Sequence, residues 1–238
     1  LYKKKIPPFD PLAIRIYFQF GVLNLTISYG LTYWATQYIY SSISSIIWSG
    51  FPLTVAIFSY FMLPDEKMNQ KKILSLLLGT CGALLVFVES LNFSGDRVPF
   101  GITIVMIAVI VASYPSVYLK KYSDVVSSLH INAVSQLMAG VLLLLFSYFI
   151  ETNQHMNWSN YNIFALIYLT IPGSLVAWFL YLWLYSHISM SQISYIAFFP
   201  PLLATILGWV ILGESLSMLA IAGGGFIILG AVLINRNG

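Results

Sequence analysis

Long apolar segments separated by short polar loops dominate the hydropathy pattern of this 238-residue chain. A helix needs about 20 apolar residues to cross roughly 30 Å of hydrocarbon. Eight segments fit that requirement: Leu12 to Trp34, Ser44 to Leu63, Ile73 to Val88, Phe100 to Leu119, Ile131 to Ile150, Ile163 to Tyr185, Ile193 to Leu212 and Met218 to Ile234. The alternating pattern of a membrane β-barrel is absent. The chain is therefore predicted to be an all-α polytopic membrane protein.

One of these segments occurs twice. The stretch 41–66 is an apolar span with Pro52 near its middle, and a shift of 148 positions leads to the stretch 189–214, where Pro52 falls on Pro200. The same shift places Phe51 on Phe199, Glu66 on Glu214 and Gly82-Ala83 on Gly230-Ala231. Internal repetition of this kind constrains the whole architecture.

The two copies differ in the number of spans they contain. The second copy has five, from about residue 100 to 234, whereas the first has three and ends near residue 88. The repeat therefore predicts two further helices before residue 1, each of about 20 residues. An odd number of spans in each copy makes the halves enter the membrane from opposite sides, as in an inverted repeat. We expect a five-plus-five helix architecture with eight of the ten helices present, divided into 1–91 and a complete second repeat at 92–238.

Basic residues mark one side of this topology. Threading eight spans brings together the N-terminal segment, the loops after the second, fourth and sixth spans, and the C-terminus. That side carries Lys3, Lys4, Lys5, Arg15, Lys67, Lys71, Lys72, Lys120, Lys121 and Arg236, with Arg97 opposite. By the positive-inside rule the basic side is cytoplasmic. We expect a multi-pass protein of the plasma membrane with a cytoplasmic C-terminus.

Composition excludes several classes of function. Hydrophobic residues make up 59% of the chain and charged residues 8%, against about 25% charged in a soluble domain. The excess of Lys and Arg lies in short loops, so it reports topology and predicts no nucleic-acid partner. The single Cys81 cannot form an intramolecular disulfide.

Enzyme chemistry finds no support in the residue pattern. His130, His155 and His187 are separated by more than 20 residues and lack the helical spacing of metal ligands. No span interior contains a carboxylate, the usual mark of a proton or cation relay. We therefore predict no catalytic residues, no metal site and no cofactor. The absence of Arg or Lys deep in a span also argues against nucleotide sugars and sugar phosphates as cargo.

Uncharged polar and aromatic side chains deep in the spans are the candidate chemistry. An amide, hydroxyl or indole N–H facing lipid is costly, so these groups should face the bundle interior. A cavity of aromatic faces and neutral hydrogen-bonding groups suits a neutral, zwitterionic or aromatic molecule. The predicted cavity residues are Asn24, Tyr29, Trp48, Tyr114, Trp178, Tyr181 and Tyr195. Helix packing is the alternative role for each, and Trp34, Tyr118, Trp183 and Tyr185 are assigned to the interfacial aromatic belt.

Prolines inside the spans form a second candidate set. A proline frees a backbone carbonyl and kinks a helix, and interrupted helices line the sites of inverted-repeat transporters. The predicted hinges are Pro52, Pro115, Pro172 and Pro200. Since Pro52 and Pro200 are related by the repeat, we expect them to act as a pair, with a tolerated kink as the alternative.

These residues together resemble the drug/metabolite transporter superfamily, and within it the EamA-domain type. That family has two five-helix repeats, each with a short polar joint, a Pro-bearing fourth helix, a Gly-Glu-like pair and a Gly-rich fifth helix. The matching residues are 189–200, Leu212-Gly213-Glu214, Gly223-Gly224-Gly225 and Gly230 in the second repeat, and 38–52, Pro64-Asp65-Glu66, Gly79 and Gly82 in the first. The first repeat departs from the pattern in having Asp65 where the family favours Gly.

The resemblance implies a secondary transporter that moves a small organic metabolite by alternating access, with export of amino acids or similar compounds as the family-level expectation. Two alternatives stay open: a non-transporting membrane scaffold or partner subunit, and a lipid-linked sugar carrier. The expected partners are a small-molecule substrate and the lipid bilayer. Small-residue faces at Gly79 with Ala83 and at Ala220 with Gly224 add a possible homodimer.

Overall fold

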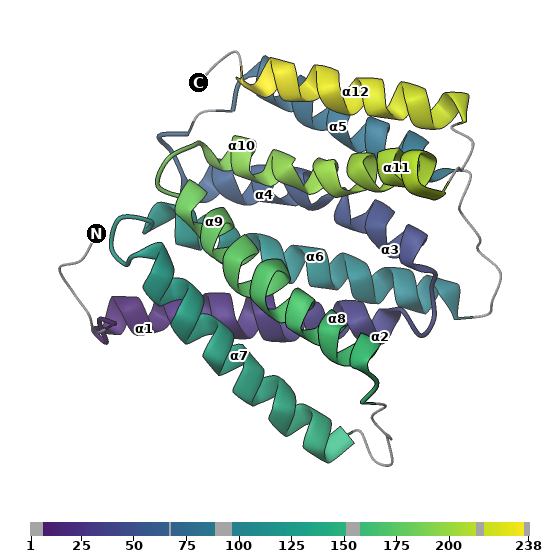
Figure 1. Cartoon of the computed structure of the whole chain (residues 1–238). Coiled ribbons are helices and arrows are strands. Elements are labelled where there is room, and N and C mark those ends of the chain that lie inside the picture. Colours follow the sequence, from purple (N-terminus) through teal and green to yellow (C-terminus); the bar gives the residue numbers. More distant parts are fainter. Residues whose placement is uncertain (1–6, 67, 89–96, 151–157, 213–216, 236–238) are drawn as a thin grey trace.

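The computed structural model describes residues 7–66, 68–88, 97–150, 158–212 and 217–235. Within these ranges the chain forms helices joined by short turns, and no strand occurs. Figure 1 shows the helices arranged as one bundle, with most of them running between the same two ends. The predicted all-α class is confirmed.

The helices follow the predicted spans, and several spans are divided by a short irregular segment. Their bounds are α1 (Pro11–Phe18), η1 (Gln19–Ser28), α2 (Tyr29–Ala35), α3 (Ser41–Trp48), α4 (Phe51–Met62), α5 (Gln70–Phe87), α6 (Val98–Lys121), α7 (Ser128–Ile150), α8 (Asn160–Thr170), η3 (Ile171–Val176), α9 (Ala177–Leu184), α10 (Met190–Tyr195), η4 (Ile196–Phe198), α11 (Phe199–Leu212) and α12 (Met218–Asn235). The second to eighth predicted spans coincide with seven helical runs that are long and apolar enough to cross a membrane.

The first predicted span differs from the others in polarity. α1, η1 and α2 form one continuous helical run of spanning length, but it is not among the seven. Arg15, Gln19 and Asn24 lower its mean hydropathy. The run nevertheless packs against both α6 and α7. Its role as an eighth span stays a prediction.

Helix bounds recur at the spacing of the sequence repeat. A shift of 148 positions carries α5 (Gln70–Phe87) onto α12 (Met218–Asn235). The same shift carries the last part of the π-helical segment η1 onto η3. Among the described residues, η1 and η3 are the only two π-helical segments. Because irregular segments recur together with regular ones, the recurrence supports the predicted repeat. The division at residues 91 and 92 itself stays a prediction.

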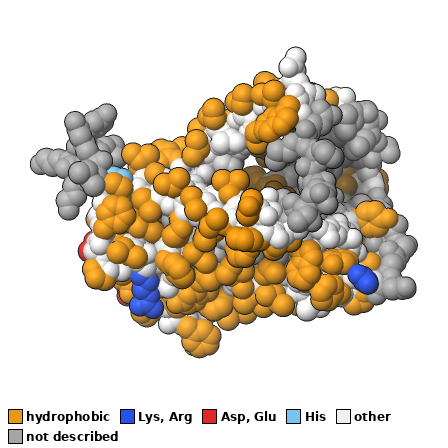
Figure 2. Space-filling model, turned by 90° about the horizontal axis from the view of Figure 1, so that it is seen from below, with side chains coloured by type: hydrophobic (Ala, Val, Ile, Leu, Met, Phe, Trp, Pro, Cys, Tyr) orange, Lys and Arg blue, Asp and Glu red, His pale blue; other side chains and the backbone are white. Residues whose placement is uncertain are grey.

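The charged side chains separate the two ends of the bundle. The left side of Figure 1 contains the first residues of α1, α5 and α10 and the last residues of α4, α6 and α12. We call this side the basic end, because Arg15, Lys71, Lys72, Lys120 and Lys121 lie there. Figure 2 shows hydrophobic side chains over most of the visible face between the ends, with Lys and Arg only at its margins. Such a surface suits contact with lipid.

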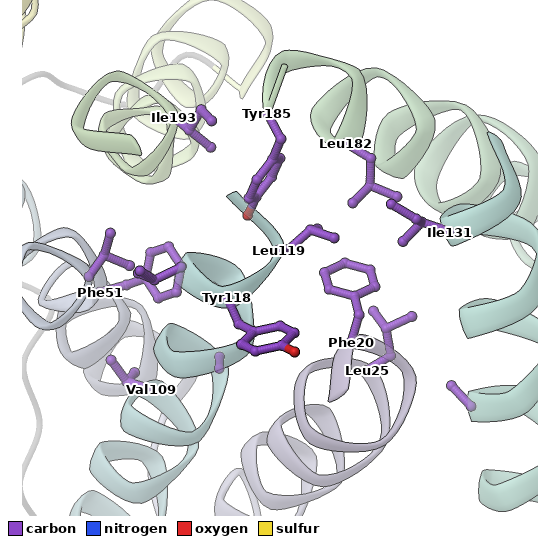
Figure 3. Close-up of a cluster of buried hydrophobic side chains, with 14 of the residues drawn as sticks. Phe20, Leu25, Phe51, Val109, Tyr118, Leu119, Ile131, Leu182, Tyr185 and Ile193 are labelled. Carbon is purple, nitrogen blue, oxygen red and sulfur yellow. The ribbon is translucent and has the colours of Figure 1, made fainter. Parts of the chain in front are cut away.

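Two groups of buried side chains hold the bundle together. The larger group joins α1, η1 and α2 to α4, α6 and the α9–α10 region, and Figure 3 shows part of it. The smaller group surrounds the α5–α12 pair and contains Leu76, Ala83, Tyr195, Phe198, Ile227 and Ile234. Six of the seven predicted cavity residues lie in or beside the first group, and Tyr195 lies in the second.

The α5–α12 pair depends on glycine at its closest approach. A Cβ added to Gly82 would lie 2.5 Å from the Gly223 carbonyl oxygen, and one added to Gly223 would lie 2.5 Å from the Gly82 carbonyl oxygen. Gly79 lies against the Phe198 ring, and Ala83 is fully buried. The face of small residues that includes Gly79 and Ala83 is therefore covered by other helices of the same chain. A homodimer stays a prediction, and this face would not form its interface.

Candidate functional site

Six of the seven predicted cavity residues come together in the larger buried group. Asn24 is buried, and the rings of Tyr29, Trp48, Tyr114, Trp178 and Tyr181 pack against that group while staying partly accessible. They come from η1, α2, α3, α6 and α9, so both halves of the chain contribute. Each of these rings therefore keeps some accessible surface while packing against buried side chains.

Aromatic rings join the first predicted span to the sixth. The Trp178 ring centroid lies 5.3 Å from that of Phe20, 6.3 Å from that of Tyr29 and 5.4 Å from that of Tyr181. The contacts of Trp178 with Phe20 and Tyr181 are both edge-to-face, a geometry that aromatic pairs prefer. Trp178 is therefore the centre of the aromatic part of the site.

Neutral polar groups lie beside these rings. The Asn24 amide donates to the Ala112 carbonyl at 3.1 Å and to the Ser116 hydroxyl at 3.1 Å, which ties η1 to α6. Tyr185 follows Tyr181 at ring centroids 5.5 Å apart, and its buried hydroxyl lies beside the Ser116 and Tyr181 side chains. These hydroxyls form a small neutral polar group next to the rings.

A second set of neutral polar groups, Trp48, Thr32, Thr54 and Ser113, lies where the second predicted span meets α2 and α6. The Trp48 indole N–H donates to the Thr32 hydroxyl at 3.3 Å. The Thr54 and Ser113 hydroxyls share a hydrogen bond of 2.5 Å, and the Tyr114 ring packs against Phe58. The predicted residues Trp48 and Tyr114 therefore pack against the same buried group as Trp178 and Tyr181.

Tyr195 lies apart from the other predicted cavity residues. Its hydroxyl donates to the Ile227 carbonyl at 2.7 Å, and its ring packs on Phe198 within the smaller buried group. The hydroxyl also lies where a side chain on Gly230 would be. The contacts of Tyr195 thus match the helix-packing alternative.

Four residues in or beside the site were missed by sequence reasoning. Phe20 and Ser116 carried no distinguishing signal, because a phenylalanine or serine in an apolar span is common. Tyr185 and Tyr118 were assigned to the interfacial belt, and this was wrong: they are 1% and 6% exposed and point inward in Figure 3. The spacing of Trp178, Tyr181 and Tyr185 on one helical face could have indicated Tyr185.

The four predicted hinge prolines occupy different local structures. Pro52 lies in the first turn of α4, directly after the turn at Ser49 and Gly50 that ends α3. Pro200 lies in the first turn of α11, directly after the tight segment η4. Pro172 lies in η3, whereas Pro115 lies inside the continuous helix α6. Pro52 and Pro200 therefore mark equivalent interruptions in the two halves, and their motion stays a prediction.

Comparison with known proteins places this geometry in a family. The EamA-like transporter family matches residues 1–88 and 99–236. The chain is 29% identical over 208 residues to the uncharacterized transporter YoaV of Bacillus subtilis, covering 86% of this chain and 68% of YoaV. It is 27% identical over 231 residues to the uncharacterized inner membrane transporter YedA of Escherichia coli K12, covering 97% of this chain and 73% of YedA.

A solved structure supports the fold independently. One crystal structure of a protein superimposes with a TM-score of 0.81 at 16% identity, over 95% of this chain and 77% of the other. At this identity the likeness concerns the fold alone. With the family match over nearly the whole length, this chain belongs to the EamA-like transporter family, whose members are transporters rather than enzymes, and it is a multi-pass membrane protein.

Proposed function

We propose that this transporter moves a small neutral, zwitterionic or aromatic metabolite, most simply an amino acid or a similar compound, out of the cell by alternating access. The observation that carries the proposal is the group of Asn24, Tyr29, Trp178 and Tyr181, in which a buried amide and three partly accessible rings come together from both halves of the chain. In inverted-repeat transporters the site lies where the repeats meet.

The chemistry of the group supports that substrate class. Rings around Trp178 offer apolar faces, while Tyr185 and the hydroxyls of Thr54 and Ser113 offer neutral hydrogen-bonding groups. Among the described residues, charged side chains lie in loops or within two turns of a helix end. A substrate with a large net charge would lack a partner in such an interior.

Transport by the full chain in proteoliposomes tests the proposal. We expect saturable movement of labelled aromatic or neutral amino acids, and no movement of a nucleotide sugar or sugar phosphate. Liposomes without protein are the control. Absence of saturable flux across a broad panel of neutral metabolites would instead favour the scaffold alternative, and flux of lipid-linked sugars would favour the sugar carrier.

The direction of the chain in the membrane is part of the proposal. Arg15, Lys71, Lys72, Lys120 and Lys121 share the basic end, so the positive-inside rule makes this end cytoplasmic in the plasma membrane. The name of YedA places that relative in an inner membrane, which agrees with this location.

Cysteine labelling is expected to confirm this orientation. With Cys81 replaced by Ser, single cysteines are introduced at Ser159, before α8, and at Ser186, after α9; both positions are exposed and lie at opposite ends. An impermeant thiol reagent outside intact cells should label position 159 and leave position 186 unlabelled until the cells are opened. The reverse pattern would contradict the orientation.

A further inference from the structure

The bundle is closed at its basic end by contacts between the two halves of the chain. Lys120, in the last turn of α6, donates from Nζ to the Tyr185 carbonyl at 2.6 Å and to the Ile188 carbonyl at 2.8 Å. These carbonyls belong to the joint between α9 and α10. One ammonium group therefore holds the joint against the end of α6.

Glu66 completes the same junction. Its Oε2 accepts the Met190 N–H at 2.7 Å, and its Oε1 lies 3.7 Å from Lys120 Nζ. Met190 is the first residue of α10. Its N–H has no acceptor within the helix, and the positive end of the helix dipole also favours a carboxylate there. The Glu66 and Lys120 side chains are 18% and 17% exposed, so water screens their interaction only in part. We call Glu66, Lys120 and the joint 185–190 the basic-end latch.

At the opposite end, the described helices make a different contact between the two halves. The repeat relates α3 to α10 and α4 to α11, so the counterpart of the α4–α10 contact is a contact between α3 and α11. α4 packs against α10, but α3 and α11 are not among the closely packed helix pairs of the described residues. In Figure 1, α3 slopes away from α11 while α4 lies behind α10. Among the described residues, the close contact of α4 with α10 at the basic end therefore has no equally close counterpart between α3 and α11.

We infer that Glu66 and Lys120 form the gate of the transport cycle at the basic end, and that the described conformation is the one with this gate shut. The inference rests on the proposed transport function. Alternating access requires that contacts at one end break when those at the other form. The latch suits this role because it joins loops and helix ends, which can separate without unfolding a helix, and because it bears directly on Tyr185, whose ring belongs to the site.

Distance measurement between spin labels tests the gate without any substrate. Labels are placed on cysteines at Phe61 on α4 and Ser186 on the joint, both exposed, in the full chain with Cys81 replaced by Ser. The parent should show one predominant short distance. Lys120→Met removes the ammonium but keeps an unbranched side chain, and should raise the ratio of long to short distances roughly 10- to 100-fold.

Two further variants make the result specific. Glu66→Gln keeps a carbonyl acceptor for Met190 and loses the charge, so it should shift the ratio in the same direction by a smaller factor. Lys121→Met is the matched control, because it removes the same charge one residue away, where the ammonium lies over the Tyr122 ring. The gate proposal would be wrong if the label distances changed in neither Lys120→Met nor Glu66→Gln. It would also be wrong if Lys121→Met changed them as much as Lys120→Met.

The gate and the proposed function can fail separately. Unchanged distances in a protein that transports amino acids would reject the gate alone. Distances that respond to Lys120→Met in a protein with no flux would keep the conformational role and reject the proposed substrate class. If Lys120→Met does not yield a monodisperse protein, Glu66→Gln carries the test, because it retains the shape and the hydrogen bond of the parent.

Discussion

Replacing Trp178 by leucine is expected to raise the substrate concentration for half-maximal flux by about 10- to 100-fold, the loss of roughly 1.4 to 3 kcal/mol from one aromatic anchor. Trp178 contacts Phe20, Tyr29 and Tyr181, so its ring forms the wall shared by the first and sixth predicted spans. Leucine keeps an apolar side chain and should leave membrane insertion intact. Flux of a labelled aromatic amino acid into proteoliposomes measures the effect.

Two companion variants separate binding from folding. Trp209→Leu is the matched control, because Trp209 on α11 is 53% exposed and lies outside both buried groups. It should change flux little. Trp178→Phe keeps a ring face without the indole N–H, and should retain most of the affinity. If Trp209→Leu and Trp178→Leu weaken transport equally, the position assigned to the site is wrong.

Gly82→Ala is expected to cause a large loss of stability. The added Cβ would meet the Gly223 carbonyl oxygen at 2.5 Å and the Ile227 backbone N at 3.0 Å, so it can be accommodated only by moving α12 away from α5. Overpacking against a backbone costs about 2 to 3 kcal/mol. In a chain of this size, that corresponds to a fall of roughly 4 to 12 °C in melting temperature.

Gly225→Ala provides the control for helix propensity. Gly225 lies on α12, and a Cβ added there would meet nothing within 4 Å. Alanine favours a helix over glycine by about 0.5 to 1 kcal/mol, and this gain applies to both positions. Gly225→Ala should therefore be neutral or slightly stabilising in a thermal unfolding assay in detergent. A melting temperature for Gly82→Ala at or above that of the parent would contradict the assigned helix contact.

Sequence reasoning was most successful where the signal is local. The second to eighth spans could be predicted because an apolar stretch of membrane length is a property of consecutive residues. The interruptions near Pro52 and Pro200 were also indicated, since proline removes a backbone donor wherever the helix runs. The first span was harder, because Arg15, Gln19 and Asn24 reduce its hydropathy although the run is helical throughout.

The candidate site shows where local reasoning ends. Tyr181, Tyr185 and Tyr195 look alike in the sequence, yet Tyr181 borders the site, Tyr185 lies buried beside it, and Tyr195 packs between α5 and α12. A soluble helix reveals its buried face by an apolar stripe, whereas a membrane helix is apolar on every side. The pattern could therefore predict that these tyrosines avoid lipid, and could not predict which neighbour each would meet.

The sequence by itself determined that this chain crosses a membrane repeatedly, that its segments recur at a spacing of 148 positions, and that its basic residues collect at one end. These are properties of composition and order. Only the tertiary structure decided that Trp178 joins the two halves, that Lys120 and Glu66 meet at the α9–α10 joint, and that α4 touches α10 while α3 and α11 are not closely packed. The reason is physical: Lys120 and Ile188 are 68 positions apart, and no local preference specifies which long-range contacts a bundle forms.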